Sequence, residues 1–285
     1  MAAWSKLGII AGGGELPVVL AEHCAATNRP YFVARVTPYA DAALDAHPGA
    51  NNSLGHMGAR MDAMRQAGCD AIVLLGQVPR QDPRNLNLDA GGMAMAPALL
   101  AAAPQGDDAL LRALLCEHER AGFRVVGADE AMADLLAQPG AWGAVAPTPA
   151  QHKDIARAAK VAAAIGSYDV GQGVVVCDGI VLAVEAQEGT DAMLRRVSEL
   201  PLTVRGTPDA RRGVLVKRPK PIQERRIDMP TIGVRTVEGA AKAGLAGIAV
   251  EAAGALVVRR DEVKAAADRS GIFVVGFTPA DVGEA

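Results

Sequence analysis

The segment 217–233, KRPKPIQERRIDMPTIG, combines several cationic side chains with two carboxylates and three prolines, and it has neither helical nor strand periodicity. Lys217 and Lys220 carry ammonium groups that suit diphosphate oxygens, and the prolines stiffen the chain between them. Gln223 can donate and accept hydrogen bonds. The carboxylate of Asp228 lies among cations that keep it ionised, which suits a Mg²⁺ ligand or a group that orients water for attack on phosphorus. This charged segment predicts phosphoryl chemistry; a surface loop of weak ion pairs is the alternative.

Two stretches with glycine follow predicted strands. Gly12, Gly13 and Gly14 lie between an apolar run and a helical pattern, where bare backbone and a helix N-terminus can contact a phosphate or a base. Gly76 and Gln77 follow another apolar run, which places them at the same carboxyl edge of a parallel sheet. The spacing matches neither the dinucleotide fingerprint nor the P-loop. The stretches predict a ligand-binding edge, and tight turns without a ligand are the alternative.

An acidic stretch, 185–191, follows a predicted strand and precedes a predicted helix. Thr190 is a candidate N-cap, and Glu185, Glu188 and Asp191 supply three carboxylates. Carboxylates at such a junction suit Mg²⁺ or an ordered water, but capping and a solvated acidic loop explain the stretch equally well. The histidines are isolated from one another, which disfavours a dinuclear metal site built from histidine.

The elements that must position these residues fall into two halves. Up to about residue 137, continuous apolar runs alternate with helical patterns, which is typical of βαβ units around a parallel sheet. The stretch 138–151 contains three prolines and precedes a helix expected to begin at Lys153. We therefore expect an α/β protein with three parts: a Rossmann-like nucleotide-binding domain with an open sheet of four or five parallel strands (1–137), a linker (138–151) and a mixed α/β catalytic domain (152–285). Within the part 152–285, the dipeptide Asp178-Gly179 predicts a hairpin with a type I′ turn.

Composition excludes several classes of protein. The chain has 285 residues, 3% of them aromatic, and a net charge of −3, so it has no basic field for nucleic acid. No apolar run approaches the roughly 18 residues of a membrane span, and no signal-peptide core develops, so a cytoplasmic location is expected. The four cysteines are scattered without a CxxC and are interpreted as reduced packing residues.

Five blocks, spread between residues 7 and 233, resemble a known family in their order along the chain. They are LGIIAGGGELP, GDDALLR, DVGQGVVVCDG, VLAVEAQEGTDAMLRRV and RPKPIQERRIDMPTIG. The last two are the most specific. With these blocks the sequence resembles the LpxI-type UDP-2,3-diacylglucosamine pyrophosphatases of lipid A biosynthesis in Gram-negative bacteria.

The resemblance implies a function and a set of site residues. The function is Mg²⁺-dependent hydrolysis of UDP-2,3-diacylglucosamine to UMP and 2,3-diacylglucosamine 1-phosphate (lipid X), with water attacking the sugar-side phosphorus, in a homodimer. Asp228 takes the position of the family's catalytic aspartate. The residues expected near the ligand are Gly12, Gly13, Gly14, Gly76, Gln77, Thr190, Asp191, Lys217, Lys220 and Gln223. Because the acyl chains of the substrate lie in a bilayer, we expect weak peripheral association with the cytoplasmic face of the inner membrane.

Two other functions stay open. An NADP-dependent oxidoreductase is one, because Arg35 follows the second predicted strand, where an NAD enzyme usually has an acidic residue. The other is a nonenzymatic nucleotide-sugar-binding sensor, in which the charged segment only clamps its ligand. Binding of NADPH would identify the first, and a UDP-sugar that stabilises the protein without any product would identify the second.

Overall fold

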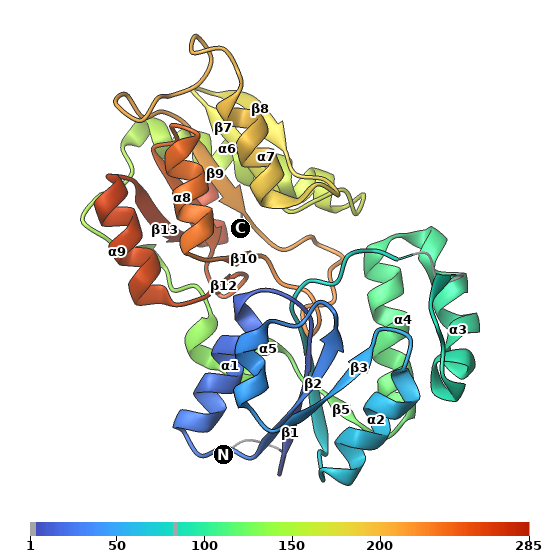
Figure 1. Ribbon diagram of the computed structural model, residues 1–285. Helices are drawn as coiled ribbons and strands as arrows, with labels where there is room; N and C mark the ends of the chain where they lie inside the picture. Colours follow the sequence, from blue (N-terminus) through green and yellow to red (C-terminus); the bar gives the residue numbers. More distant parts are fainter. Residues whose placement is uncertain (1–3, 82–84, 285) are drawn as a thin grey trace. The chain divides into compact units, whose positions relative to one another are not determined.

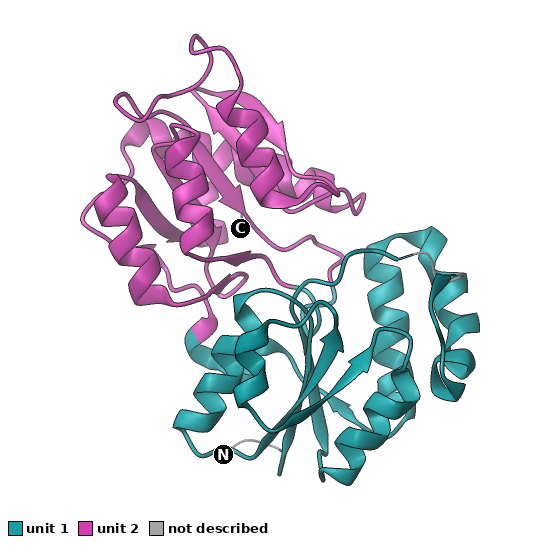
Figure 2. Ribbon diagram, viewed as in Figure 1, with its two compact units in different colours: residues 1–134, 224–228 teal, residues 135–223, 229–285 magenta. Residues whose placement is uncertain are grey.

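The computed structural model describes residues 4–81 and 85–284 (Figure 1). The chain folds into two compact units, residues 1–134 with 224–228 and residues 135–223 with 229–285 (Figure 2). It therefore passes from one unit to the other after residues 134, 223 and 228. The expected fold class is confirmed: the protein is α/β, with a parallel sheet in the N-terminal region and a mixed sheet in the C-terminal region.

The first unit is built on a parallel sheet of five strands in its described part, in the order β3-β2-β1-β4-β5. These are β1 (Leu7–Ala11), β2 (Tyr31–Thr37), β3 (Gly49–Ser53), β4 (Ala71–Leu75) and β5 (Arg124–Val125). The chain builds outward from β1 in one direction and then from β4 in the other. The carboxyl ends of β1 and β4 therefore form a topological switch point, where open α/β sheets usually bind ligands.

Helices cover both faces of this sheet. The helical segments in this part of the chain are α1 (Glu15–Ala26), η1 (Ala42–Ala46), α2 (Met57–Gln66), α3 (Ala90–Ala102), η3 (Ala103–Gln105), α4 (Asp107–Arg120), α5 (Ala128–Ala131) and η4 (Ala133–Leu135), the last of which ends one residue into the second unit. Along β1, Leu7 and Ile9 join one core with α1, and Ile10 joins the other with α2 and α4. Alternate residues thus fill opposite cores, which explains why the strand reads as a continuous apolar run.

The second unit has a mixed sheet in the order β6-β13-β11-β9-β7-β8. Its strands are β6 (Gly140–Ala141), β7 (Gly173–Cys177), β8 (Ile180–Val184), β9 (Val214–Lys217), β11 (Gly247–Glu251) and β13 (Phe273–Phe277); β10 (Thr231–Ile232) and β12 (Leu256–Val257) pair separately. Strands β9, β11 and β13 are parallel, whereas β7 runs antiparallel to both β8 and β9. The turn of the β7–β8 hairpin has positive φ at Asp178 and Gly179, as a type I′ turn requires.

The helices of the second unit are α6 (Pro149–Gly166), α7 (Gly189–Ser198), α8 (Val234–Lys242), α9 (Arg260–Ser270) and η5 (Pro279–Val282). Helix α6 packs on one face of the sheet, and α7, α8 and α9 pack on the other. The expected start of α6 at Lys153 is wrong. The helix begins four residues earlier because Thr148 and Gln151 form a capping box, and Pro149 suits the first helical position.

The cysteines only partly fit the packing interpretation. Cys24, Cys69 and Cys177 are buried, and burial raises the pKa of Cys69 and of Cys177 to about 11, so both stay protonated thiols near neutral pH. Cys116 is exposed on α4, so the interpretation is wrong there. Within the described ranges, no helix combines the length and the apolar composition that crossing a bilayer requires.

Candidate functional site

The two predicted glycine loops meet at the switch point of the first sheet. The N–H of Gly12 donates to Leu75 O at 2.8 Å, and Gly13 and Gln77 exchange two backbone hydrogen bonds of 2.8 Å. Gly76 has φ +87°, and a Cβ there would lie 2.6 Å from Gly13 O. The glycines therefore allow two loops to cross in close contact, and the N–H groups of Gly12 and Gly13 are engaged in that crossing.

Gly14 differs from its two neighbours. It is exposed, has φ +94°, and precedes α1, whose first turn receives no side-chain cap. A Cβ at Gly14 would meet no atom within 4 Å. Of the three predicted glycines, it is therefore Gly14 that leaves open space beside a helix N-terminus.

Arg35 gives no support to the oxidoreductase alternative. Its side chain is buried, with Nε donating to Leu44 O at 3.0 Å and Nη2 donating to Leu44 O and His47 O. The guanidinium thus donates its hydrogen bonds to backbone carbonyls around η1. In an NADP enzyme, an arginine at this position would bind the phosphate of the cofactor.

A buried polar cluster forms around Lys217 at the end of β9. Its Nζ donates to Thr190 Oγ1 at 2.7 Å and to Thr231 O at 3.3 Å. The Thr190 hydroxyl donates in turn to Glu185 Oε1 at 2.7 Å, and this oxygen lies 4.0 Å from Nζ. Lys217 and Glu185 are only 4% and 6% exposed. Thr190 is therefore not an N-cap, as the sequence suggested, but joins a buried ammonium to a buried carboxylate; Glu188 holds the N-cap position of α7.

Gly173 makes this cluster possible. It pairs with Lys217 across β7 and β9, and on its other side its carbonyl accepts the N–H of Glu185. A Cβ at Gly173 would lie 2.3 Å from Glu185 Oε2, so the glycine leaves room for the carboxylate in this position. Oε2 is buried and has no hydrogen-bond partner among the described residues. The sequence indicated Lys217 and Thr190, whereas the roles of Glu185 and Gly173 emerge only from the strand pairing.

Lys220 and Gln223 are also held within the second unit. Lys220 Nζ lies 2.6 Å from Asp169 Oδ1, and both side chains are largely buried. Gln223 accepts the N–H of Lys220 at 2.9 Å and donates to Gln172 Oε1 at 3.2 Å. The first half of the charged segment is therefore fixed on residues 169–172. Sequence reasoning did not single out Asp169 and Gln172, although both lie in one of the five family-like blocks.

Asp228 belongs to the first unit. Its N–H donates to Glu224 O at 3.1 Å, so residues 224–228 form a turn, and Ile227 packs on the core around α4. Glu224 N donates to Asp108 Oδ1 at 2.8 Å, and Arg226 pairs with Glu119 at 2.8 Å. The charged face of α4 thus anchors the turn that carries Asp228.

The charges in this turn stabilise one another. Arg226 hydrogen-bonds to both carboxylate oxygens of Glu224 at 3.0 Å and thereby lowers the pKa of Glu224, while the same hydrogen bonds raise the pKa of Arg226. Arg112 hydrogen-bonds to Asp108, which raises the pKa of Arg112. The sequence left open a loop of compensating ion pairs as an alternative for the charged segment. The structure confirms such a pair between Glu224 and Arg226.

The predicted site residues are distributed over both units. Gly12, Gly13, Gly14, Gly76, Gln77 and Asp228 belong to the first unit, and Thr190, Asp191, Lys217, Lys220 and Gln223 belong to the second. Asp191 pairs with Arg235 at 2.6 Å, and both side chains are exposed.

A preformed metal cage is absent from the part of the chain that the structure describes, where no three His, Cys, Asp or Glu side chains are grouped to hold an ion. Mg²⁺ in nucleotide enzymes is usually bound through one or two carboxylates together with substrate phosphates and water. Asp228 is partly exposed on an anchored turn. A single carboxylate of this kind fits that mode of binding.

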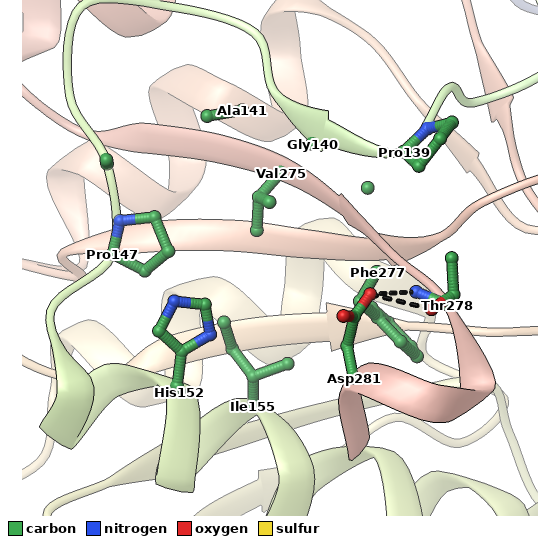
Figure 3. Close-up of a pocket in the computed structure, with 12 residues that line it drawn as sticks. Pro139, Gly140, Ala141, Pro147, His152, Ile155, Val275, Phe277, Thr278 and Asp281 are labelled. Carbon is green, nitrogen blue, oxygen red and sulfur yellow. Dashed lines mark hydrogen bonds between the residues drawn. The ribbon is translucent and has the colours of Figure 1, made fainter. Parts of the chain in front are cut away.

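The second unit also has a pocket of about 530 Å³ near α6 and the end of β13 (Figure 3). Ile155, Val275 and Phe277 contribute apolar walls, and His152 and Asp281 contribute polar groups. Asp281 accepts the N–H and the hydroxyl of Thr278, each at 2.7 Å, and these hydrogen bonds lower the pKa of Asp281. This carboxylate is already engaged in capping η5, so the pocket offers few polar groups to a ligand. Its lining residues include none of the predicted site residues.

Comparison with known proteins covers nearly the whole chain. The model of the LpxI N-terminal domain matches residues 6–135, and that of the LpxI C-terminal domain matches residues 138–275. The chain is 53% identical over 274 residues to the UDP-2,3-diacylglucosamine pyrophosphatase LpxI of Caulobacter vibrioides, covering 96% of this chain and 98% of that protein. The chain therefore belongs to the LpxI family.

Proposed function

We propose that this protein hydrolyses the diphosphate of UDP-2,3-diacylglucosamine to UMP and lipid X in lipid A biosynthesis. The observation that carries the proposal is the 53% identity, over nearly the full length of both chains, to a protein named for this activity. The buried ammonium of Lys217, next to Thr190 and at the carboxyl edge of a sheet, agrees with it, since an anionic diphosphate requires a fixed cation.

In this proposal each residue has a distinct role. Lys217 and Lys220 stabilise the charge on the diphosphate, and Gln223 orients one of its oxygens. Asp228 positions the water and accepts its proton as the water oxygen bonds to the sugar-side phosphorus and the anhydride bond to UMP breaks. When Mg²⁺ is bound through Asp228, it supplies further charge neutralisation for the departing UMP. Gly14 and the first turn of α1, with Gly76 and Gln77 beside them, contact the nucleotide.

In the same proposal, the location follows from the substrate and the assembly from the family resemblance. Its two acyl chains hold it in a bilayer, so the protein associates weakly with the cytoplasmic face of the inner membrane. The protein acts as a homodimer. Analytical ultracentrifugation tests the dimer, and a single monomeric species at micromolar concentration would contradict it.

Replacing Asp228 tests the catalytic assignment. We expect Asp228→Asn to lower turnover by about 10²- to 10⁴-fold, the range for loss of a group that handles a proton in the transition state. Substrate affinity should change little, because the turn that carries Asp228 is held by Glu224 and Arg226. The matched control is Asp62→Asn, which changes an exposed carboxylate in the same unit. Rates are measured on detergent-dispersed substrate with Mg²⁺, and an Asp228→Asn enzyme as active as the control would refute the assignment.

Labelled water tests the bond that forms. In H₂¹⁸O with Mg²⁺, we expect the label in the phosphate of lipid X and unlabelled UMP, as measured by mass spectrometry. Label in UMP would still support hydrolysis but would refute attack on the sugar-side phosphorus. Stabilisation by the UDP-lipid without any product would favour the sensor.

A further inference from the structure

Helix α3 is apolar throughout, yet it lies at the surface. Its thirteen residues, AGGMAMAPALLAA, include no charged and no hydrogen-bonding side chain. The neighbouring α4 carries acidic and basic residues along its length. A helix that is apolar on every side is normally buried on every side. In α3 the buried residues are Gly92, Met95 and Ala102, and the residues on the opposite side of the helix are exposed.

The exposed side of α3 is a continuous apolar stripe. It consists of Ala90, Met93, Ala94, Pro97, Leu100 and Ala101, all of which are at least partly exposed and follow the three- and four-residue spacing of one helix face. Met93 is 62% exposed and Leu100 is 47% exposed. In the described part of the first unit, these two are the exposed large hydrophobic side chains, and they lie seven residues apart on the same face.

The inner side of α3 is firmly attached, so the stripe is not the result of a loosely placed helix. Asp89 caps the helix by accepting the N–H of Gly92 at 2.7 Å, and it also accepts the N–H of Ala59 at 2.7 Å in the first turn of α2. A Cβ at Gly91 would lie 2.4 Å from Gly58 Cα, and one at Gly92 would lie 2.4 Å from Gly55 O. The glycines thus seat α3 tightly against α2, with the apolar stripe facing outward.

We infer that the α3 stripe docks this protein on the surface of a lipid bilayer. The inference rests on the proposed function, in which the substrate is a diacyl lipid that the protein must reach in a membrane. Arg80 lies beside the carboxyl end of α3 and η3, where its guanidinium donates to Ala103 O at 2.8 Å and pairs with Asp107 at 2.9 Å. Its side chain is still half exposed, so it can also contact a lipid phosphate.

The size and chemistry of the stripe favour a bilayer over a second copy of the chain. A helix of 13 residues is about 20 Å long and about 10 Å wide, so the stripe covers on the order of 200 Å², against about 800 Å² per partner in a stable interface. It also has no aromatic or arginine anchor and no side-chain hydrogen-bonding group, which protein partners use to fix their position. The apolar boundary of a bilayer requires neither.

Vesicle flotation of the full chain tests the inference. The probe is vesicles of phosphatidylcholine with phosphatidylglycerol, without substrate, and the variant is the double change Met93→Asp with Leu100→Asp. We expect the wild type to float with the vesicles and the variant to lose roughly tenfold or more of this binding, because two carboxylates cannot enter the apolar boundary. The matched control is Leu202→Asp, an exposed leucine of the second unit, which should bind as the wild type does.

Activity on two forms of the substrate separates the inference from the proposed function. The variant should hydrolyse detergent-dispersed substrate as fast as the wild type, but hydrolyse vesicle-embedded substrate roughly tenfold or more slowly. Wild-type hydrolysis in detergent without any vesicle binding would overturn the inference and leave the function standing. No hydrolysis in either form would refute the function itself.

Two further readouts cover the remaining outcomes. If the double variant fails to fold, as judged by circular dichroism, Met93→Trp replaces it: its fluorescence should be quenched by brominated lipids, whereas that of Leu202→Trp should not. Equal fluorescence of the Met93→Trp protein with and without brominated lipids would overturn the inference. A double variant that binds vesicles normally but dissociates into monomers would assign the stripe to a second copy of the chain and also overturn it.

Discussion

At the scale of single residues, the Lys217 ammonium depends on a carboxylate that it does not contact directly. Glu185 lies 4.0 Å away, and Thr190 connects the two groups through hydrogen bonds of 2.7 Å. A buried charge is costly without a partner, so each of the two ions stabilises the other. This places Glu185 among the groups that orient the Lys217 side chain, although the sequence alone did not separate it from a solvated acidic loop.

Removing one partner should therefore destabilise the second unit. Lys217→Ala leaves Glu185 buried without compensation, and we expect the free energy of unfolding to fall by about 3 to 5 kcal/mol. Adding Glu185→Gln removes the orphaned charge and should recover part of this loss without restoring activity. Urea unfolding measures the stability.

The matched control for Lys217 is Arg235→Ala, which breaks the exposed pair with Asp191 and should cost about 0 to 1 kcal/mol. Equal costs for the two alanine variants would contradict the account of the buried pair.

His118 gives the first unit a pH-dependent stability. It is buried on α4, and desolvation lowers its pKa, with Arg60 adding to this effect and the hydrogen bond to Leu114 O opposing it. The unfolded chain then binds a proton at a higher pH than the folded chain does. Between pH 7 and 5.5 we expect the free energy of unfolding to decrease as the pH falls, and His118→Gln to flatten this slope. The free energy of unfolding is measured with urea at each pH. If it depends on pH equally in the wild type and in His118→Gln, His118 is not the source of the dependence.

At the scale of elements, the sequence predicted those whose hydrophobic pattern is local. Strands β1, β4 and β11 are buried on both faces and read as apolar runs. Strand β3, with the sequence GANNS, has no such pattern, because it is an edge strand positioned by its parallel pairing with β2. Helix α3 was missed for a related reason: an evenly apolar, Gly- and Ala-rich stretch has no amphipathic period.

The crossing of the two glycine loops is an element-scale feature with its own test. Gly76 and Gly68 both have positive φ, but only at Gly76 would a Cβ meet backbone atoms within 3 Å. We expect Gly76→Ala to cost about 2 kcal/mol more than Gly68→Ala, since backbone strain is common to both and the clash is not. Thermal unfolding of the two variants measures the difference. If they prove equally stable, the loops tolerate more separation than the contacts imply.

At the scale of the whole molecule, the charged segment belongs to both units. Its first part is fixed on residues 169–172, and residues 224–228 are fixed on α4, so the chain that carries Asp228 returns to the first unit after about ninety residues in the second. The proposed catalytic carboxylate and the proposed diphosphate cations are thus contributed by different units.

Disrupting this return should weaken the first unit selectively. Ile227 packs on the core around α4, so Ile227→Asp should lower the protection from hydrogen exchange in β4 and α4, at a cost of about 2 to 4 kcal/mol. Ile222→Asp, five residues earlier and exposed in the second unit, is the control and should leave that protection unchanged. Equal protection of α4 in the two variants would contradict the assignment of 224–228 to the first unit.

The sequence by itself determined the α/β class, the parallel sheet of the N-terminal half, the hairpin at Asp178-Gly179, the two glycine loops at a single sheet edge, and the family. All of these depend on local periodicity, turn chemistry or ordered motifs. Only the tertiary structure decided that Thr190 connects Glu185 to Lys217 beside Gly173, that Asp108 binds the backbone of Glu224, and that α3 keeps one apolar side at the surface. The physical reason is distance along the chain: a contact between residues 108 and 224 arises from the packing of separate elements, and no local pattern encodes it.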